Sequence, residues 1–169
     1  MPTDIERRRV FEQCINDQAA SLYRVAYRLL GCRDLAQDLV QETYCQAWRG
    51  LESLVDITKI RGWLFAILRN QYSKLLRRGK RWHTMGETLE MVDRESNSDL
   101  IHQERNDLVQ YALEQLSEDH KLPILLVTME GWSVAEAAEW LDVPEGTVLS
   151  RLHRGREKLR RIIAAEVGH

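Results

Sequence analysis

The strongest constraint on the fold is a run of 23 residues near the carboxyl end, Trp132–Arg154, which carries the signals of two short helices joined by a tight turn. Ser133 followed three residues later by Glu136 is a capping box, so the spacing predicts that a helix begins there. That helix should stop near Leu141, because the next residues favour a turn and Pro144 suits the first position of a new helix. This pattern indicates a helix-turn-helix.

The two predicted helices have an inner and an outer side. Ala137 and Ala138 are small enough for close helix crossing, and Val143, Val148 and Leu152 can fill the space between the helices. The outward residues of the second helix are Glu145, Thr147, Ser150, Arg151, His153 and Arg154. Side chains of this kind reach base edges and phosphates in a major groove, so we expect this motif to contact DNA. A purely structural helix pair is the alternative.

The charge of the chain is segregated, although its formal net charge is only -2. Residues 57–86 contain eight cations and no acid, whereas residues 87–119 contain ten acids and two cations. Residues 151–161 then hold six cations and one acid. Two basic patches separated by an acidic stretch suggest two contacts with one polyanion. Ordinary solvated helix faces would explain either patch singly but explain both less well.

The first part of the chain predicts two helices in succession. Apolar residues recur at helical spacing over Ile5–Leu30, which is one long helix or two, and Gly31 is a natural stop. Asp34 can cap the next helix, which runs to about Trp48 and ends at Gly50.

This second helix has one apolar and one polar side. Its inward stripe is Leu35, Leu39, Val40, Thr43, Ala47 and Trp48, with Tyr44 near the edge. Its other side carries Asp34, Gln37, Asp38, Gln41 and Glu42. The polar side is either a solvated face, which composition alone favours, or an acidic and amide-bearing docking face for a basic or polar partner helix.

Leu51–Lys59 has no sustained period and is predicted to be a loop long enough to suspect a role. A third helix opens at Ile60 and is expected to reach Arg78. Its packing candidates are Trp63, Leu64, Ile67, Leu68, Leu75 and Leu76. Arg61, Asn70, Tyr72, Lys74, Arg77 and Arg78 are left for a partner. Aromatics and amides interleaved with cations suit unstacked bases, where stacking contributes about 1–3 kcal/mol per base, although Trp63 is at least as well explained as core.

The second part of the chain begins after a polar, acidic stretch, Met85–Ile101, which is predicted to be a linker with little fixed structure. Helical spacing resumes over Arg105–Leu116, and Ser117 can cap a further helix. Pro123 makes that helix start late or bend, and Gly131 ends it. The predicted fold is therefore all-α, with two small helical domains at 1–83 and 105–169 joined by a flexible linker at 84–104.

Several classes of protein are excluded or disfavoured by composition. There is no long uncharged apolar run that could span a membrane, and the charged amino terminus is not a secretory signal. The three cysteines are Cys14, Cys32 and Cys45, which form no CxxC pair and are expected to be buried thiols of a cytosolic protein. The five histidines have no ligand spacing, so no metal site is expected. No nucleophile–base pair indicates an enzyme.

Three motifs in order resemble the bacterial extracytoplasmic-function sigma factors. They are Asp34–Tyr44 (DLAQDLVQETY), then Arg61–Leu64 (RGWL) with Asn70, and then Gly146–Leu152 (GTVLSRL) with Arg154 and Arg156–Leu159. The resemblance covers about Ser21–Ile163. Three motifs in register are far more specific than a helix-turn-helix alone.

The resemblance implies a cytoplasmic, dissociable subunit of bacterial RNA polymerase that reads promoter DNA, is monomeric when free and needs no cofactor or metal. It implies that Asp34, Asp38, Gln41 and Glu42 dock on the clamp helices of the largest core subunit. The Leu51–Lys59 loop would hold a flipped base of the minus-ten element. Minus-ten contacts would come from Arg61, Trp63, Asn70, Lys74, Arg77 and Arg78. Minus-thirty-five contacts would come from Thr147, Ser150, Arg151, His153 and Arg154. An anti-sigma factor is a further expected partner.

The chain departs from the family pattern at four positions. Leu149 replaces a frequent cation, Lys74 a frequent Asp, Ala137 a usual Ile, and Gly155 a usual Ala. Gly155 is expected to weaken its helix by roughly 0.5–1 kcal/mol relative to Ala. The alternative function is a helix-turn-helix repressor or activator that binds a palindrome as a dimer without being a polymerase subunit.

Overall fold

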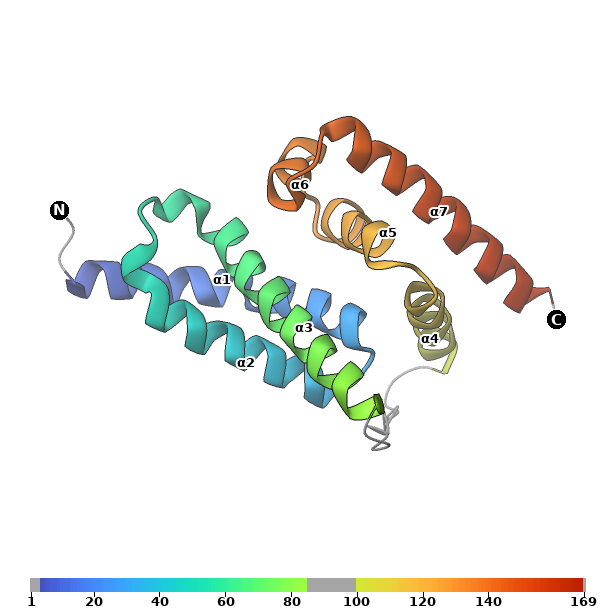
Figure 1. The fold of residues 1–169 in the computed structure, drawn as a ribbon, viewed down its shortest axis with the longest axis horizontal. Coiled ribbons are helices and arrows are strands. Elements are labelled where there is room, and N and C mark those ends of the chain that lie inside the picture. Colours follow the sequence, from blue (N-terminus) through green and yellow to red (C-terminus); the bar gives the residue numbers. More distant parts are fainter. Residues whose placement is uncertain (1–3, 85–99, 169) are drawn as a thin grey trace. The chain divides into compact units, whose positions relative to one another are not determined.

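The computed structural model describes the backbone of residues 4–84 and 100–168, and every regular element in these two ranges is helical (Figure 1). Contacts between Cα atoms divide the chain into two compact units, Met1–Asp93 and Arg94–His169. The prediction of an all-α fold with two helical domains is confirmed. Residues 85–99, most of the predicted linker, lie outside the described residues.

The first unit is built from three long helices that pack on one another: α1 (Asp4–Leu30), α2 (Arg33–Gly50) and α3 (Ile60–Thr84). Two short 3-10 turns, η1 (Leu51–Ser53) and η2 (Ile57–Lys59), connect α2 to α3. The first apolar segment is thus one helix, where the sequence allowed one or two. The largest fully buried side chains of this unit are Phe11, Leu22, Leu64, Phe65 and Leu68.

The turn between α1 and α2 begins as predicted at Gly31, which has a φ of 68° and donates its N–H to the Tyr27 carbonyl at 2.7 Å. A positive φ of this kind costs glycine little. The predicted cap is wrong, because α2 begins at Arg33 and its N-cap residue is Cys32, which makes no side-chain cap bond. Asp34 lies exposed in the first turn, where its charge is still favourable at the helix amino terminus.

The inner side of α2 largely follows the predicted stripe. Its buried residues are Ala36, Leu39, Val40, Thr43 and Ala47. The Thr43 hydroxyl donates to the Leu39 carbonyl at 2.7 Å, which satisfies a polar group inside the core. Trp48 was predicted to point inward but is 45% exposed. Its ring covers the edge of the core instead, with its centroid 5.8 Å from that of Phe11 and the Arg8 guanidinium 5.4 Å above it.

Helix α3 begins at Ile60 as predicted but continues to Thr84, six residues beyond the expected end. Its core side is formed by Ile60, Leu64, Phe65, Leu68 and Tyr72. Tyr72, predicted to be free for a partner, is only 6% exposed, and Leu76, predicted to pack, is 37% exposed. The reason is the phase of the helix: residues four apart share a face, and the series from Ile60 through Leu64 and Leu68 reaches Tyr72.

The second unit contains α4 (Leu100–Glu114), α5 (Glu118–Pro123), a π-helical turn η3 (Ile124–Met129), α6 (Val134–Leu141) and α7 (Glu145–Val167). Helix α7 packs against α4, α5 and α6, so it organises this unit (Figure 1). The largest fully buried side chains of the second unit are Leu113, Pro123, Leu125, Leu126 and Val148.

Pro123 changes the hydrogen-bonding pattern rather than the starting point of its helix. Ser117 is the N-cap residue of α5, as predicted, but its hydroxyl faces His120 Nδ1 at 3.0 Å and caps no backbone N–H. Pro123 lacks a donor and ends α5, and the chain continues as a π-helix. The Glu130 N–H closes this turn on the Leu125 carbonyl at 3.1 Å. Gly131, with a φ of 69°, then ends the segment as predicted.

Candidate functional site

The polar side of α2 presents the four predicted docking residues together. Asp34, Asp38, Gln41 and Glu42 are all exposed, and their spacing places them on one side of the helix. Glu42 Oε1 accepts a hydrogen bond from Gln46 Nε2 at 2.7 Å. The face therefore offers carboxylates and amides to a partner without a change in the fold.

A groove of about 490 Å³ runs between α2 and α3 and brings together residues predicted for two different tasks. Asp38 and Glu42 line it from α2, and Lys74 and Arg78 line it from α3. Leu35, Leu39 and Leu75 provide its apolar part. The groove has one acidic and one basic wall, an arrangement that the linear sequence did not predict.

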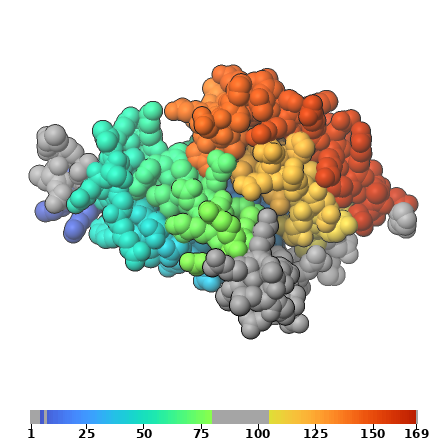
Figure 2. All heavy atoms as spheres, in the orientation of Figure 1, coloured from blue at the N-terminus to red at the C-terminus, as the bar shows by residue number. Residues whose placement is uncertain are grey.

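Most of the predicted minus-ten residues share one side of α3. Trp63, Asn70, Lys74 and Arg77 lie at spacings of seven, four and three, which align on a helix. Asn70, Lys74, Arg77 and Arg78 are exposed. Part of α3, drawn in green, lies on the face of the molecule shown in Figure 2. Arg61 is not on this face, because two residues of an α-helix correspond to about 200° of rotation.

Trp63 lies between the two roles considered for it. Its side chain is half-buried, and a Cβ built on Gly50 would lie 3.4 Å from its Cζ2 atom, which is ordinary contact. One part of the ring therefore packs over the end of α2 while the remainder stays accessible. This position permits both packing and contact with a base.

The segment Leu51–Lys59, predicted to be a loop, consists mostly of the 3-10 turns η1 and η2 and is held at defined points. Leu54 is 8% exposed and anchors the segment, whereas the neighbouring Val55 is 95% exposed. Asp56 caps η2: its carboxylate accepts hydrogen bonds from the Thr58 N–H at 2.9 Å and the Thr58 hydroxyl at 2.7 Å. These bonds lower the pKa of Asp56 because they stabilise the ionised form.

The helix-turn-helix prediction is confirmed in its local chemistry. The Ser133 hydroxyl accepts the Glu136 N–H at 3.1 Å, and Glu136 Oε2 accepts the Ser133 N–H at 2.7 Å, which completes the capping box. Asp142 ends α6 in the left-handed region with a φ of 55°. Pro144 differs by one position, because it is the N-cap residue of α7 and not its first helical residue. Ala137, Ala138, Val148 and Leu152 are buried as predicted, whereas Val143, which was also predicted to fill this space, is half-buried.

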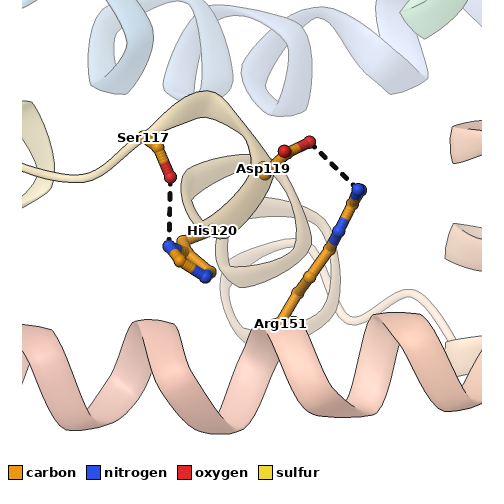
Figure 3. Close-up of polar contacts among 4 residues, drawn as sticks. All are labelled: Ser117, Asp119, His120 and Arg151. Carbon is orange, nitrogen blue, oxygen red and sulfur yellow. Dashed lines mark hydrogen bonds and ion pairs between the residues drawn. The ribbon is translucent and has the colours of Figure 1, made fainter.

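The predicted DNA-contact residues of α7 divide into two groups. Ser150, His153 and Arg154 are exposed and Thr147 is half-buried. The side chain of Arg151 is 26% exposed and reaches back to α5, where its Nη2 atom lies 3.2 Å from Asp119 Oδ1 (Figure 3). The structure therefore does not present Arg151 in the same way as its neighbours. Sequence reasoning missed Asp119, which it counted only as one acid of the acidic stretch.

Gly155 is buried where α7 crosses α5. A Cβ at this position would lie 2.7 Å from Ile124 Cδ1 and 3.3 Å from both the Cβ and the carbonyl oxygen of His120. The sequence indicated a glycine that weakens its helix, and the structure adds a packing reason for it. A side chain here would require the Ile124 side chain to move and His120 to give by a few tenths of an ångström.

The described residues contain neither a cluster of three potential metal ligands nor a helix long and apolar enough to cross a membrane. All three cysteines are free thiols. The prediction of buried thiols is wrong, because Cys14 and Cys32 are half-buried and Cys45 is exposed. Burial and the nearby Asp17 carboxylate raise the pKa of the Cys14 thiol, which makes it a poorer nucleophile.

Family comparison assigns each unit to a known protein region. Residues 15–82 match the sigma-70 region 2 family, and residues 106–159 match the sigma-70, region 4 family. The first match contains α2 and most of α3, and the second contains the helix-turn-helix. This pair of matches does not favour the alternative of a dimeric repressor, since region 2 accounts for the first unit.

The relatives point the same way. The chain is 36% identical over 148 residues to the ECF RNA polymerase sigma factor SigL of Mycobacterium tuberculosis, with 86% of this chain and 84% of SigL covered. It is 34% identical over 160 residues to the ECF sigma factor SigE of Mycolicibacterium smegmatis, and this match covers 91% of the chain but only 62% of SigE.

A solved structure shares both the fold and the sequence pattern. The sigma factor RpoE of Bartonella quintana, solved in complex with the anti-sigma factor NepR, matches with a TM-score of 0.74 and 31% identity over 90% of this chain and 96% of RpoE. Together with the two region matches, this likeness shows that the chain belongs to the extracytoplasmic-function RNA polymerase sigma factors.

Proposed function

We propose that this chain binds core RNA polymerase and directs promoter-specific initiation by reading the minus-ten and minus-thirty-five elements. The observation that carries the proposal is the presence, in one chain, of a region 2 unit with an exposed acidic and amide face and a region 4 unit with a capped helix-turn-helix. Two weak contacts on one chain reach useful affinity when both are tethered to the same complex. The chain acts by binding and has no catalytic task of its own.

The docking surface is the outer side of α2. Asp34, Asp38, Gln41 and Glu42 form it, and the clamp helices of the largest core subunit are the partner. Exposed carboxylates next to amides suit a partner helix that carries cations and hydrogen-bond donors. The adjoining groove continues this surface onto Lys74 and Arg78 of α3, so a partner seated there would meet both signs of charge.

The minus-ten contact lies on α3 and the preceding segment. Trp63, Asn70, Lys74, Arg77 and Arg78 would meet the melted strand, and Arg61 would contribute from another side of the helix. The Leu51–Lys59 segment would hold a flipped base, because extrusion of a base costs a few kcal/mol that a preformed pocket can offset. Capping by Asp56 and anchoring by Leu54 give this segment the required preorganisation.

The minus-thirty-five contact lies on α7. Ser150, His153 and Arg154 are exposed for the major groove, with Thr147 at the amino-terminal end of the same helix. Leu149 is 54% exposed and replaces a cation that the family often carries, so an apolar contact takes the place of a charged one. The proposed domains are 1–83 for polymerase and minus-ten contacts and 105–169 for the minus-thirty-five contact.

An anti-sigma factor is a proposed partner of this chain, since RpoE of Bartonella quintana was solved with the anti-sigma factor NepR. The same acidic and amide face that serves polymerase is open to such a competitor. We also propose that the protein is cytoplasmic, where polymerase is found, and monomeric when free, because a single helix-turn-helix within holoenzyme needs no two-fold partner.

The decisive experiment is reconstitution with core RNA polymerase. We expect the purified chain to co-elute with core enzyme in gel filtration and to direct run-off transcription from promoter fragments that the holoenzyme selects from random DNA. A chain that elutes as a dimer, footprints a palindrome and fails to bind core enzyme would contradict the proposal. The free chain analysed alone by gel filtration serves as the control for oligomeric state.

A further inference from the structure

Arg151 faces a different direction from the other polar residues of α7. It adjoins the buried stripe of Val148, Leu152 and Gly155, and its guanidinium reaches across to α5. There its Nη2 atom lies 3.2 Å from Asp119 Oδ1, and only 26% of its side chain is exposed (Figure 3).

This ion pair lies one helical turn from the close crossing at Gly155. At Gly155 the backbone of α7 approaches α5 so closely that a Cβ would lie 3.3 Å from the Cβ and the carbonyl oxygen of His120 and 2.7 Å from Ile124 Cδ1, so these neighbours would have to shift to admit a side chain. A third contact follows on the other side of the crossing, where Arg156 Nη2 donates to Thr128 Oγ1 at 3.0 Å. The crossing sets how near α7 lies to α5. The polar contacts on either side resist rotation of α7 about its own axis.

We propose that Asp119 and Arg151 are positioning residues for minus-thirty-five recognition. Their ion pair holds α7 at the rotation that presents Ser150, His153 and Arg154 to the base edges. The inference rests on the proposed function. It gives Arg151 a different task from the direct DNA contact predicted for it, and it adds Asp119 to the residues on which promoter choice depends.

The energetics of the Asp119–Arg151 ion pair favour an effect on recognition of the minus-thirty-five sequence rather than on the stability of the fold. The Asp119 side chain is 70% exposed, and ion pairs of this kind contribute little to stability because water screens them. Base readout is more demanding, since contacting side chains must be held to within about 0.5 Å of their productive positions. A small rotation of α7 is therefore enough to weaken a specific contact while leaving the fold intact.

A charge exchange separates the positioning role from a DNA contact. The binding of reconstituted holoenzyme is measured on promoter fragments selected by the wild-type holoenzyme, with the minus-thirty-five element intact or scrambled. We expect Arg151→Glu and Asp119→Arg each to reduce the preference for the intact element by about fivefold to tenfold. The double variant D119R/R151E should recover most of the preference. If the double variant is as defective as R151E alone, Arg151 contacts DNA itself and the proposal is wrong.

The salt dependence of binding gives a second, independent readout. If Arg151 neutralised a phosphate, Arg151→Gln would reduce the slope of log K against log salt concentration by about 0.9. The positioning role predicts an unchanged slope with a reduced preference. An altered slope would overturn it.

Two controls complete the design. Glu118→Gln removes the neighbouring carboxylate of α5 without touching the pair and should leave the preference unchanged; an equal loss would show that the ion pair is not the cause. All variants should melt within a few degrees of the wild type by circular dichroism, and a loss of preference that only accompanies unfolding would also overturn the inference. Failure of the wild-type chain to bind core enzyme would instead contradict the proposed function.

Discussion

At the residue scale, Gly155 decides how closely α7 can lie against α5. Glycine lowers helix propensity by about 1 kcal/mol relative to alanine, so the local preference favours alanine. The crossing of α7 and α5 disfavours alanine, because a Cβ at position 155 would lie 2.7 Å from Ile124 Cδ1 and 3.3 Å from the His120 backbone oxygen. Overpacking of a core typically costs about 1–3 kcal/mol, which equals or exceeds the gain in propensity.

Gly155→Ala is therefore expected to lower the free energy of unfolding of the second unit by up to about 2 kcal/mol, the overpacking cost less the gain in helix propensity. Urea unfolding followed by circular dichroism measures the change. Gly146→Ala is the matched control in the same helix, because a Cβ there meets nothing within 4 Å. A Gly155→Ala protein as stable as the control would mean that Ile124 and His120 accommodate the added Cβ without cost.

Lys121 is a second residue whose environment determines its behaviour. Its side chain is 7% exposed, and burial lowers its pKa below the ordinary value of 10.5, although the carboxylates of Glu114 and Glu118 act in the opposite direction. The folded state then binds fewer protons than the unfolded state between the two pKa values. The free energy of unfolding should therefore rise as the pH increases from the folded pKa toward 10.5.

We expect Lys121→Met to be more stable than the wild type near neutral pH, because the buried charge is removed and most of the apolar volume is kept. The difference should shrink as the pH approaches 10.5, where the wild-type amine also loses its charge. Urea unfolding of both proteins at several pH values tests this, and titration of tyrosines cancels in the comparison. A less stable Met variant at neutral pH would show that the two carboxylates outweigh desolvation.

At the scale of the secondary-structure element, two N-cap serines of the second unit are expected to contribute differently to stability. Ser133 begins α6 with a complete capping box, whereas the Ser117 hydroxyl at the start of α5 bonds to His120 and caps no backbone group. Loss of a side-chain cap typically costs about 1 kcal/mol. Serine at an N-cap position is thus expected to stabilise the protein more where its hydroxyl caps a backbone N–H, as in Ser133, than where it does not, as in Ser117.

Ser133→Ala should lower the free energy of unfolding by about 1 kcal/mol, and Ser117→Ala should lower it by less. Both variants remove one hydroxyl at an N-cap, so each is the control for the other. Equal losses in thermal or urea unfolding would show that the capping box contributes nothing beyond the loss of the hydroxyl.

At the scale of the whole molecule, the proposed function places its two main contacts on separate units. The proposed docking face is on α2 of the first unit, and the proposed minus-thirty-five contacts are on α7 of the second. Substitutions in the two surfaces should therefore affect different steps of initiation. Their effects should be nearly additive because the two sites lie on separate units.

Asp38→Ala is expected to weaken binding to core polymerase by about tenfold while leaving the minus-thirty-five preference of the assembled holoenzyme unchanged. Arg154→Ala should do the reverse, with a loss of about 1–3 kcal/mol in discrimination at one position of the element. Titration of core enzyme and promoter-fragment binding measure the two effects. Equal losses in both assays for both variants would indicate misfolding instead of separate surfaces.

Much of this protein is determined by its sequence alone, because capping boxes, glycine stops and helical periods act over a few residues. Ser133 with Glu136, Gly31 and Gly131 predict the starts and ends of helices that the structure contains. Motif order is likewise local information, and it was sufficient to indicate the family that the comparisons show.

Only the tertiary structure decided which side of a helix meets which neighbour. Arg151 is followed closely by Arg154 in sequence, yet one pairs with α5 and the other faces solvent. Gly155 acquires its packing role from α5, and the groove between α2 and α3 joins acids and cations that are more than thirty residues apart. These outcomes depend on the rotation and separation of packed helices, which are set by contacts distant in sequence and not by spacing along the chain.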